Sequence, residues 1–167
     1  MHHRLRSLLI ILAVVALDIL SKIYIRTHVS GLDMIPIIPG FFNIVHAENP
    51  GAAFSMLADA PLIVRTLVLR GISVVVMLII GVMLWRDEKA QGETKLMRIG
   101  LAIVFGGALG NFFDRAFRGT VTDFVQLFFG SYEFPSFNVA DSAINIGAAI
   151  LIWELWKNRK AQTSDPL

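Results

Sequence analysis

Four long apolar segments constrain this chain more than any other feature of its sequence. They cover residues 8–25, 62–85, 96–113 and 137–156. At about 1.5 Å of rise per residue, each segment is near the ~20 residues that a helix needs to cross a hydrocarbon core about 30 Å thick. Hydrophobic residues make up 55% of the chain and charged residues only 17%, as is typical of integral membrane proteins. The sequence therefore predicts a single all-α integral membrane domain, residues 1–167, with four transmembrane helices.

The first apolar segment also resembles a cleavable signal peptide, because Arg4 and Arg6 precede it. A cleavage site of small residues should then follow the apolar stretch, but the chain reads LDILSKIYIR. We therefore expect this segment to be retained as a transmembrane helix.

The distribution of Lys and Arg predicts the orientation in the membrane. Two basic residues precede the first span, four lie between Arg86 and Arg98, and three follow the fourth span. Loops that stay in the cytoplasm are enriched in Lys and Arg. Both termini and the middle loop should therefore be cytoplasmic, which leaves two outer loops, residues 26–61 and 114–136.

Polar and ionisable side chains gather toward the outer face of this predicted topology. They come from three helices and both outer loops: Asp18, Lys22, Asn49, Asn111, Asp114, Arg115, Asp123, Asn138 and Asp141. Ionisable residues at membrane depth are rare and usually functional. We therefore expect a functional site at the outer surface of the membrane.

Some of these charges also have a purely structural explanation. Asp18 and Lys22 are four residues apart with the acid first, the favourable order for an ion pair within a helix. A structural ion pair and a catalytic role both remain open for them. Asp114 could be a helix-end anchor with Arg115 as its counter-ion. The small residues of GGALG, residues 106–110, suggest close helix packing rather than a nucleotide-binding loop.

Asp123 and Asp141 differ from the other acids, because neither has a basic residue within three positions. An unpaired acid among Phe, Val and Leu should have a raised pKa. Two such acids brought together would share a proton, so that one could activate water while the other donates a hydrogen bond. These two residues are the candidate catalytic pair.

The two outer loops differ in character. The first contains MIPIIPGFFNIVHAENPGAAFSM, short β-prone runs broken by Pro-Gly pairs, which predicts a small hairpin or sheet on the membrane surface. The second contains Phe124, Phe128, Phe129 and Tyr132 and is typical of an interfacial segment held by aromatic side chains. Together they could cover a site whose floor is the helix bundle.

Other chemistries have less support in the sequence. The chain has no cysteine, and the outer histidines His28 and His46 lack metal-ligand spacing, so we expect no metal and no cofactor. A Ser/Lys peptidase that uses Ser55 and Lys22 is an alternative. A small ion- or proton-coupled transporter is another, although polar groups thin out across the inner half. No nucleic-acid partner is indicated, and nothing demands more than a monomer.

Several short motifs, in order along almost the whole chain, resemble the bacterial lipoprotein signal peptidases (signal peptidase II), which are intramembrane aspartyl proteases. They are the pair Asp18 and Lys22, ENPGAAFS at 48–55, GGALGNFFDR at 106–115, VTDF at 121–124 and FNVADSAIN at 137–145. Each motif alone is weak. Their order, on this topology and at this length, makes the resemblance specific.

The resemblance implies roles for the polar residues. Asp123 and Asp141 would be the catalytic dyad of an aspartic endopeptidase. Asn49, Asn111, Arg115 and Asn138 would line the site. Asp18, Lys22, Gly51 and Asp114 would help to shape it.

The resemblance also implies a substrate and a location. The substrate would be a prolipoprotein that carries a diacylglyceryl group on a cysteine, and cleavage just before that cysteine would release the signal peptide. The enzyme would lie in the bacterial inner membrane, in contact with membrane lipid. Its first outer loop would form a small β-cradle and its second a surface helix.

Overall fold

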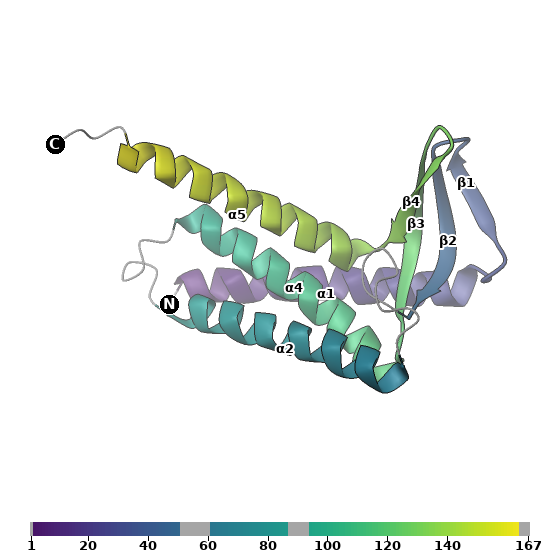
Figure 1. Ribbon diagram of the computed structural model, residues 1–167, viewed down its shortest axis with the longest axis horizontal. Coiled ribbons are helices and arrows are strands. Elements are labelled where there is room, and N and C mark those ends of the chain that lie inside the picture. Colours follow the sequence, from purple (N-terminus) through teal and green to yellow (C-terminus); the bar gives the residue numbers. More distant parts are fainter. Residues whose placement is uncertain (1, 51–60, 87–93, 164–167) are drawn as a thin grey trace.

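The computed structural model describes residues 2–50, 61–86 and 94–163. Four long helices run alongside one another: α1 (His2–His28), α2 (Leu62–Trp85), α4 (Lys95–Phe117) and α5 (Val139–Thr163). All four are long and apolar enough to cross a membrane. A small sheet lies at one end of this bundle, and both chain termini lie toward the other (Figure 1). The predicted four-helix membrane fold is confirmed.

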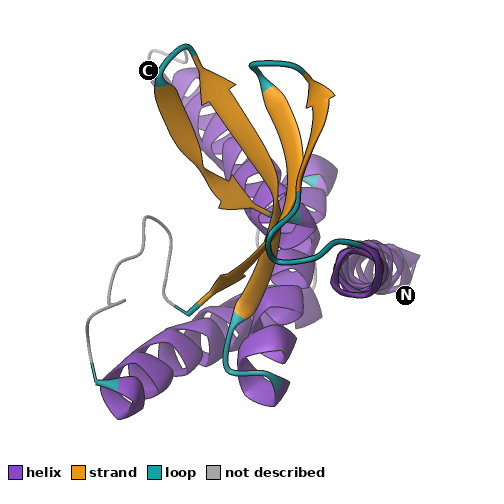
Figure 2. Ribbon diagram, turned by 90° about the vertical axis from the view of Figure 1, so that its right-hand side faces the viewer, coloured by secondary structure: helices purple, strands orange, loops and turns teal. Residues whose placement is uncertain are grey.

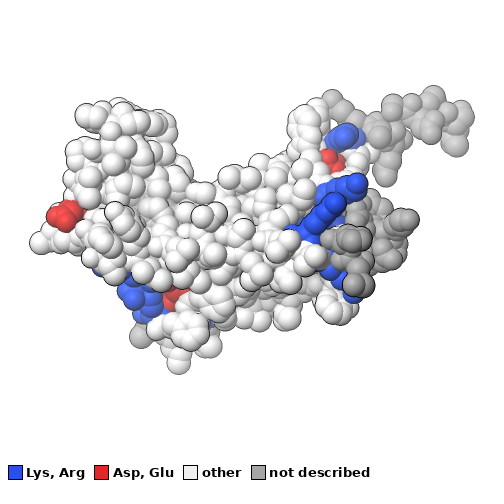
Figure 3. All heavy atoms as spheres, turned by 180° about the vertical axis from the view of Figure 1, so that it is seen from behind, with Lys and Arg blue, Asp and Glu red and all other residues white. Residues whose placement is uncertain are grey.

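Many apolar side chains of the helices are exposed on the outside of the bundle. Leu9 on α1, Leu78 on α2 and Leu155 on α5 are all more than half exposed. Charged side chains on the face seen in Figure 3 gather toward the two ends of the molecule, with an uncharged band between them. This is the surface expected of helices whose solvent is lipid, since hydrocarbon does not penalise exposed Leu or Ile.

Glycines let α4 approach α1 and α5 closely. A Cβ atom on Gly107 would lie 2.5 Å from the carbonyl oxygen of Ala140 in α5. On another face of α4, a Cβ on Gly106 would lie 2.8 Å from Cβ of Val14 in α1. Small residues at helix interfaces permit such backbone contact in membranes. The packing role predicted for GGALG is confirmed.

Both outer loops contribute strands to one antiparallel sheet of order β1-β2-β3-β4. The strands are β1 (Met34–Ile38), β2 (Phe42–Asn49), β3 (Val121–Phe129) and β4 (Tyr132–Phe137). The hairpin predicted for the first loop is present, and Gly40 in its turn has a φ of 73°, which suits glycine. Seen from the sheet end, the strands extend across the ends of the helices (Figure 2).

The second outer loop forms strands where the resemblance implied a surface helix. β3 pairs with β2 on one side and with β4 on the other. Val, Thr and Phe favour strands, and Gly130 (φ 65°) closes the turn between β3 and β4. Because the first loop supplies β2 as a partner, this segment can satisfy its backbone groups as a strand. The surface-helix expectation was wrong for the described residues 118–138.

The helix α2 lies at the side of the bundle and is tied to α4 by two arginines. The guanidinium of Arg70 donates a hydrogen bond to the backbone carbonyl of Arg115. At the opposite end, Arg98 of α4 donates to the carbonyl oxygen of Leu84 at 2.5 Å. Arg98 thus satisfies a carbonyl at the C-terminal end of α2, where intrahelical partners run out.

Candidate active site

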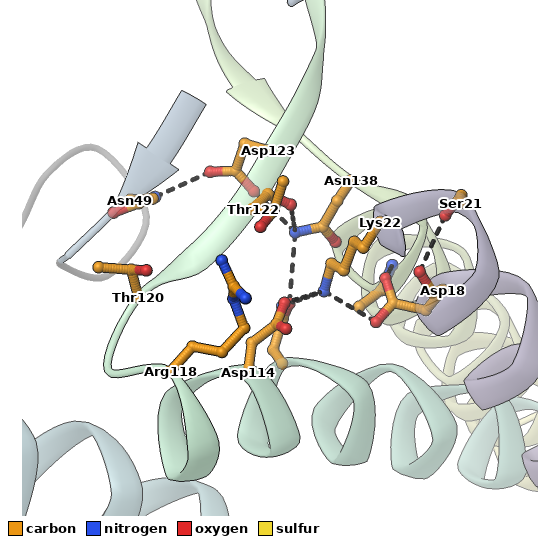
Figure 4. A network of polar contacts seen from close by, with 12 residues as sticks. Asp18, Ser21, Lys22, Asn49, Asp114, Arg118, Thr120, Thr122, Asp123 and Asn138 are labelled. Atoms are coloured by element: carbon orange, nitrogen blue, oxygen red, sulfur yellow. Dashed lines mark hydrogen bonds and ion pairs between the residues drawn. The ribbon is translucent and has the colours of Figure 1, made fainter. Parts of the chain in front are cut away.

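Polar side chains meet where α1, α4 and α5 come together with β3 (Figure 4). Most of them are buried, although they are strongly hydrophilic. Those with at most 7% of their surface exposed are Asp18, Lys22, Asn111, Asp114, Thr122, Asp123 and Asn138. Burial of so many polar groups is tolerated only where they pair with one another. The outer-end polar cluster predicted from the sequence is therefore one connected network.

Lys22 is the central positive charge of this network. Its ammonium lies 2.8 Å from Asp18 Oδ2 and 2.9 Å from Asp114 Oδ2. It also donates a hydrogen bond to Asn111 Oδ1 at 3.0 Å. The ion pair expected from the spacing of Asp18 and Lys22 is present, and it extends to α4. All three donor positions of the ammonium have partners, so Lys22 holds α1 against α4.

Asp18 in turn fixes the start of α5. Its Oδ1 accepts a hydrogen bond from the backbone N–H of Ala140 at 2.9 Å. The first N–H groups of a helix have no partner within the helix, and a carboxylate there also interacts favourably with the helix dipole. Ala140 directly precedes Asp141, so the position of Asp141 depends on α1.

Asn138 and Asp141 form a reciprocal cap at the start of α5. The backbone N–H of Asp141 donates to Asn138 Oδ1 at 3.0 Å, and the backbone N–H of Asn138 donates to Asp141 Oδ2 at 3.2 Å. This is the geometry of a capping box, with Asn and Asp in place of the usual Ser and Glu. Asn111 Nδ2 donates to the other oxygen, Asp141 Oδ1, at 2.8 Å. Both carboxylate oxygens of Asp141 are thus held in place.

Asp123 lies on β3 and is held by two amides. Asn138 Nδ2 donates to its Oδ1 at 2.7 Å, and Asn49 Nδ2 donates to its Oδ2 at 3.0 Å. Burial raises the pKa of Asp123 to about 6; the hydrogen bond from Asn49 opposes this shift and the negative charge of Asp141 adds to it. The direction of this shift agrees with the one expected from the apolar surroundings of Asp123. Asn138 contacts both acids, so it joins Asp123 and Asp141 into one unit.

Asp114 has two ion-pair partners beyond the neighbouring Arg115 that the sequence suggested. Its Oδ1 lies 2.5 Å from the guanidinium of Arg26, and its Oδ2 contacts Lys22, both on α1. The neighbouring Arg115 instead interacts electrostatically with Asp141 and Asp123 as well as with Asp114. Adjacent residues on a helix point in different directions, so sequence neighbours are poor candidates for an ion pair.

Arg26, Thr122 and Glu48 belong to the network but were not singled out from the sequence. Arg26 Nε donates to Thr122 Oγ1 at 2.8 Å, and Thr122 donates to Glu48 Oε1 at 2.9 Å. One signal was available for Arg26, which is four residues after Lys22 and eight after Asp18 and so shares their helix face. Glu48 and Thr122 face each other through the pairing of β2 with β3, which the sequence does not specify.

Two candidates, Gly51 and Ser55, lie outside the described residues. Among the residues that the structure does describe, no group of three or more His, Cys, Asp or Glu side chains is placed to hold a metal ion.

The polar network holds two carboxyl groups, those of Asp123 and Asp141, beside a fixed set of hydrogen-bond donors, and the pKa of Asp123 is raised. That is a setting for proton transfer to and from a water molecule.

Comparisons with known proteins agree with this description. The family model for signal peptidase (SPase) II matches residues 10–157. The lipoprotein signal peptidase of Solibacter usitatus (strain Ellin6076) is 42% identical over 145 residues, which cover 87% of each chain. The lipoprotein signal peptidase of Syntrophus aciditrophicus (strain SB) is 38% identical over 150 residues, 90% of this chain and 91% of the relative.

Two solved structures of bacterial membrane enzymes, both obtained by the in meso method, have the same fold. The first superposes with a TM-score of 0.82 at 30% sequence identity, and the aligned region covers 97% of this chain and 94% of the solved one. The second has a TM-score of 0.77 at 31% identity, with 90% and 92% covered. With a matching family model over most of its length and relatives near 40% identity, the chain belongs to the signal peptidase II family and is a multi-pass protein of the bacterial inner membrane.

Proposed function

We propose that this protein is an aspartic endopeptidase that removes the signal peptide from diacylglyceryl-modified prolipoproteins by cutting just before the lipidated cysteine. Membership of the signal peptidase II family supports the coarser part of this proposal, removal of signal peptides from prolipoproteins. The aspartic mechanism rests on the geometry of the site, and the cleavage point is what the resemblance to the family implies.

The observation that carries the mechanism is the link between Asp123 and Asp141 through Asn138. The side-chain amide of Asn138 donates to Asp123, while its backbone N–H donates to Asp141. Two carboxyl groups held so close influence each other's ionisation, and the Asp141 charge contributes to the raised pKa of Asp123. Such a pair takes up one proton more readily than two isolated acids, so one member can be base and the other acid.

In the proposed mechanism the pair carries one proton, and we place it on Asp123 because burial favours the neutral form of this carboxyl group. The carboxylate of Asp141 takes a proton from a water molecule, whose oxygen attacks the carbonyl carbon of the scissile peptide bond. Asp123 donates a hydrogen bond to the carbonyl oxygen as it gains charge. Collapse of the tetrahedral intermediate breaks the C–N bond, and the proton taken up from water goes to the leaving amine. No covalent bond to the enzyme forms.

The supporting residues hold the carboxyl groups of Asp123 and Asp141 in position. Asn111 and Asn138 fix the Asp141 carboxylate, and Asn49 with Asn138 fixes that of Asp123. Asn49 is on β2 and Asn111 on α4, so the sheet and the bundle must dock correctly before both acids are oriented. Arg115 supplies positive charge near the pair.

The proposed topology places both termini in the cytoplasm and the site near the outer face. A signal peptide could then lie in lipid beside the helices while its scissile bond reaches the polar network. The acyl chains on the cysteine would remain in the membrane and set the depth of the bond. The sheet, with its short extended strands, would hold the substrate segment after it unwinds, because a peptide bond inside a helix is shielded from attack.

A Ser/Lys mechanism requires a lysine whose amino group can contact the serine hydroxyl, and the contacts of Lys22 oppose this. Its amino group already contacts Asp18, Asp114 and Asn111, which occupy its three donor positions. A lysine held in this way is a structural cation rather than a base.

The reaction itself can be tested with purified protein and a prolipoprotein made with and without its diacylglyceryl group. Mass spectrometry of the products locates the cleaved bond. The proposal expects one cut, with the lipidated cysteine as the new N-terminus, and at least a hundredfold slower cleavage of the unmodified substrate. Cleavage at another bond, or equal rates for the two substrates, would contradict the proposed specificity.

A further inference from the structure

An apolar groove of about 680 Å³ lies between α2 and α4, away from the polar network. Its walls are Val74, Met77, Leu78, Gly81, Val82, Trp85, Arg86, Phe105 and Leu109. This volume is in the range of about 300–1,000 Å³ that is usual for small-molecule sites. None of the residues in the proposed catalytic network lines it, so it is a separate feature of the molecule.

The length of the groove along α2 matches the thickness of one leaflet of a bilayer. Its walls on α2 run from Val74 to Trp85, which is about 16 Å at 1.5 Å per residue. Half of a hydrocarbon core about 30 Å thick is about 15 Å. Leu78 and Val82 are 63% and 51% exposed, so the groove is open sideways toward the membrane. A single extended acyl chain would fit this depth and could enter from lipid.

Two arginine side chains lie at one end of the groove. Arg86 lines that end, and the guanidinium of Arg4 lies 4.8 Å from the ring centroid of Trp85, another wall residue. Among the described residues that line the groove, none is acidic. This is the end of the bundle toward which both termini lie (Figure 1). A lipid phosphate at the membrane interface would sit at the level of these two cations.

We propose that this groove binds one acyl chain of an anionic phospholipid, with the phosphate held by Arg86 and Arg4. In the proposed topology this lipid belongs to the cytoplasmic leaflet. It fills the space between α2 and α4 beside the contacts that already join these helices, which are the hydrogen bonds of Arg70 and Arg98 and a buried apolar cluster that includes Ile80 and Leu101. The bound lipid would therefore complete the packing of α2 against the bundle.

Charge argues against two other occupants. The n-region of a signal peptide is itself positively charged, so Arg86 and Arg4 would repel it. A symmetric contact between two copies of this chain would bring the same guanidinium groups toward each other. An anionic lipid is the occupant whose charge is complementary.

Trp85 provides a direct probe of occupancy. The substitutions Trp153→Phe and Trp156→Phe leave it as the single tryptophan of the chain. The variant that carries both substitutions is placed, one copy per disc, in phosphatidylcholine nanodiscs. Its fluorescence is then measured as unlabelled lipid is replaced by phosphatidylglycerol with brominated acyl chains, or by phosphatidylcholine with the same chains, since bromine quenches a tryptophan that it touches.

We expect half-maximal quenching at a several-fold lower fraction of brominated phosphatidylglycerol than of brominated phosphatidylcholine. Arg4→Gln and Arg86→Gln should each raise the phosphatidylglycerol fraction required about fivefold, whereas Arg6→Gln on the same helix should not. Asp87 and Glu88 follow Arg86 in the sequence, lie outside the described residues and are left unchanged.

A second pair of variants tests the groove rather than the charge. A Cβ on Gly81 would lie 3.6 Å from the Phe105 ring, so Gly81→Leu places a side chain in the groove. A Cβ on Gly71 of the same helix meets no atom within 4 Å, which makes Gly71→Leu the matched control. Gly81→Leu should reduce quenching by phosphatidylglycerol to the phosphatidylcholine level, and Gly71→Leu should not.

Three results would overturn the proposal. Equal quenching by the two lipids would mean ordinary annular lipid without a site. Displacement of brominated phosphatidylglycerol by a synthetic signal peptide would assign the groove to the substrate. Loss of quenching when two copies share one disc would make it an interface between copies.

Discussion

Asp18 accepts the backbone N–H of Ala140 at 2.9 Å, although 122 residues separate the two in the chain. The carboxylate thus caps the first turn of α5 from a position on α1, and its second oxygen binds Lys22. Ala140 precedes Asp141, so this contact transmits the position of α1 to a proposed catalytic residue. It links the stability of the buried ion pairs to the geometry of the site.

Removal of Lys22 should therefore unfold or loosen the bundle. Lys22→Met leaves Asp18 and part of Asp114 as buried charges without their cation, and loss of one partner of a buried pair costs about 3–5 kcal/mol. Thermal unfolding of the purified protein in detergent should show a large fall in midpoint. Adding Asp18→Asn should recover part of the loss, because the amide oxygen of asparagine can still accept from Ala140. If the double variant were less stable than Lys22→Met, Asp18 would not be the charge left unpaired.

The contact between Gly107 and α5 predicts an effect on both packing and catalysis. A methyl group on Gly107 would clash with the Ala140 carbonyl oxygen and push away the helix start that carries Asp141. Gly107→Ala should cost about 1–3 kcal/mol of stability, as overpacking does, and should lower turnover of the prolipoprotein substrate. Gly71→Ala on α2, where there is open space, is the matched control. Normal turnover in Gly107→Ala would show that the register of α4 and α5 is not critical.

Asn138 should act on the chemical step more than on substrate binding. Its amide donates to Asp123, and its loss leaves a buried carboxyl oxygen of Asp123 without this donor, which costs about 1–3 kcal/mol. Asn138→Ala should lower kcat about 10- to 100-fold with little change in KM. Asn138→Ser tests whether capping of α5 is enough for activity. Serine can cap α5, but its shorter side chain cannot replace the hydrogen bond from the amide of Asn138 to Asp123. Full activity in Asn138→Ser would argue that the link to Asp123 is dispensable.

The raised pKa of Asp123 predicts a particular dependence of stability on pH. An ordinary Asp carboxyl group has a pKa of 3.8, whereas that of Asp123 in the folded protein is about 6. Between these two pH values the folded protein therefore keeps a proton on Asp123 that the unfolded chain has lost. Stability contributed by the protonated form is therefore lost as pH rises through this window, by about 2–3 kcal/mol in total. Asp123→Asn should remove this dependence, which thermal unfolding at pH 4, 5, 6 and 7 would reveal.

A matched control is Asp33→Asn, which changes an exposed carboxyl group on the same side of the molecule. Its pH profile should follow that of the wild-type protein. An unchanged profile in Asp123→Asn would mean that burial does not raise the pKa of Asp123.

The sequence predicts those parts of this structure that depend on local pattern. The four helices follow from hydropathy because a bilayer demands about 20 apolar residues per helix. The pair Asp18 and Lys22 follows from helix periodicity, as does the packing role of Gly106 and Gly107. The candidate pair Asp123 and Asp141 could be singled out because each stands in an apolar run without a neighbouring base.

Features that depend on long-range contacts could not be predicted in the same way. Asp114 forms ion pairs with Lys22 and Arg26, about 90 residues earlier in the chain, which its neighbour Arg115 in the sequence does not suggest. The second outer loop forms β3 because β2, from the other loop, is beside it, and no local signal carries that information. The cap at Asn138 could have been found, since Asn-x-x-Asp before an apolar run is typical of a helix start.

The dyad is tested most directly by cleavage of a diacylglyceryl-modified prolipoprotein by purified wild type, Asp123→Asn, Asp141→Asn, Asp114→Asn and Ser55→Ala, each shown to be folded. We expect the first two variants to lose at least a hundredfold in kcat, Ser55→Ala to remain active, and Asp114→Asn to fall between them. Near-normal turnover in Asp123→Asn or Asp141→Asn would contradict the aspartic mechanism, and loss of activity in Ser55→Ala alone would favour a serine nucleophile.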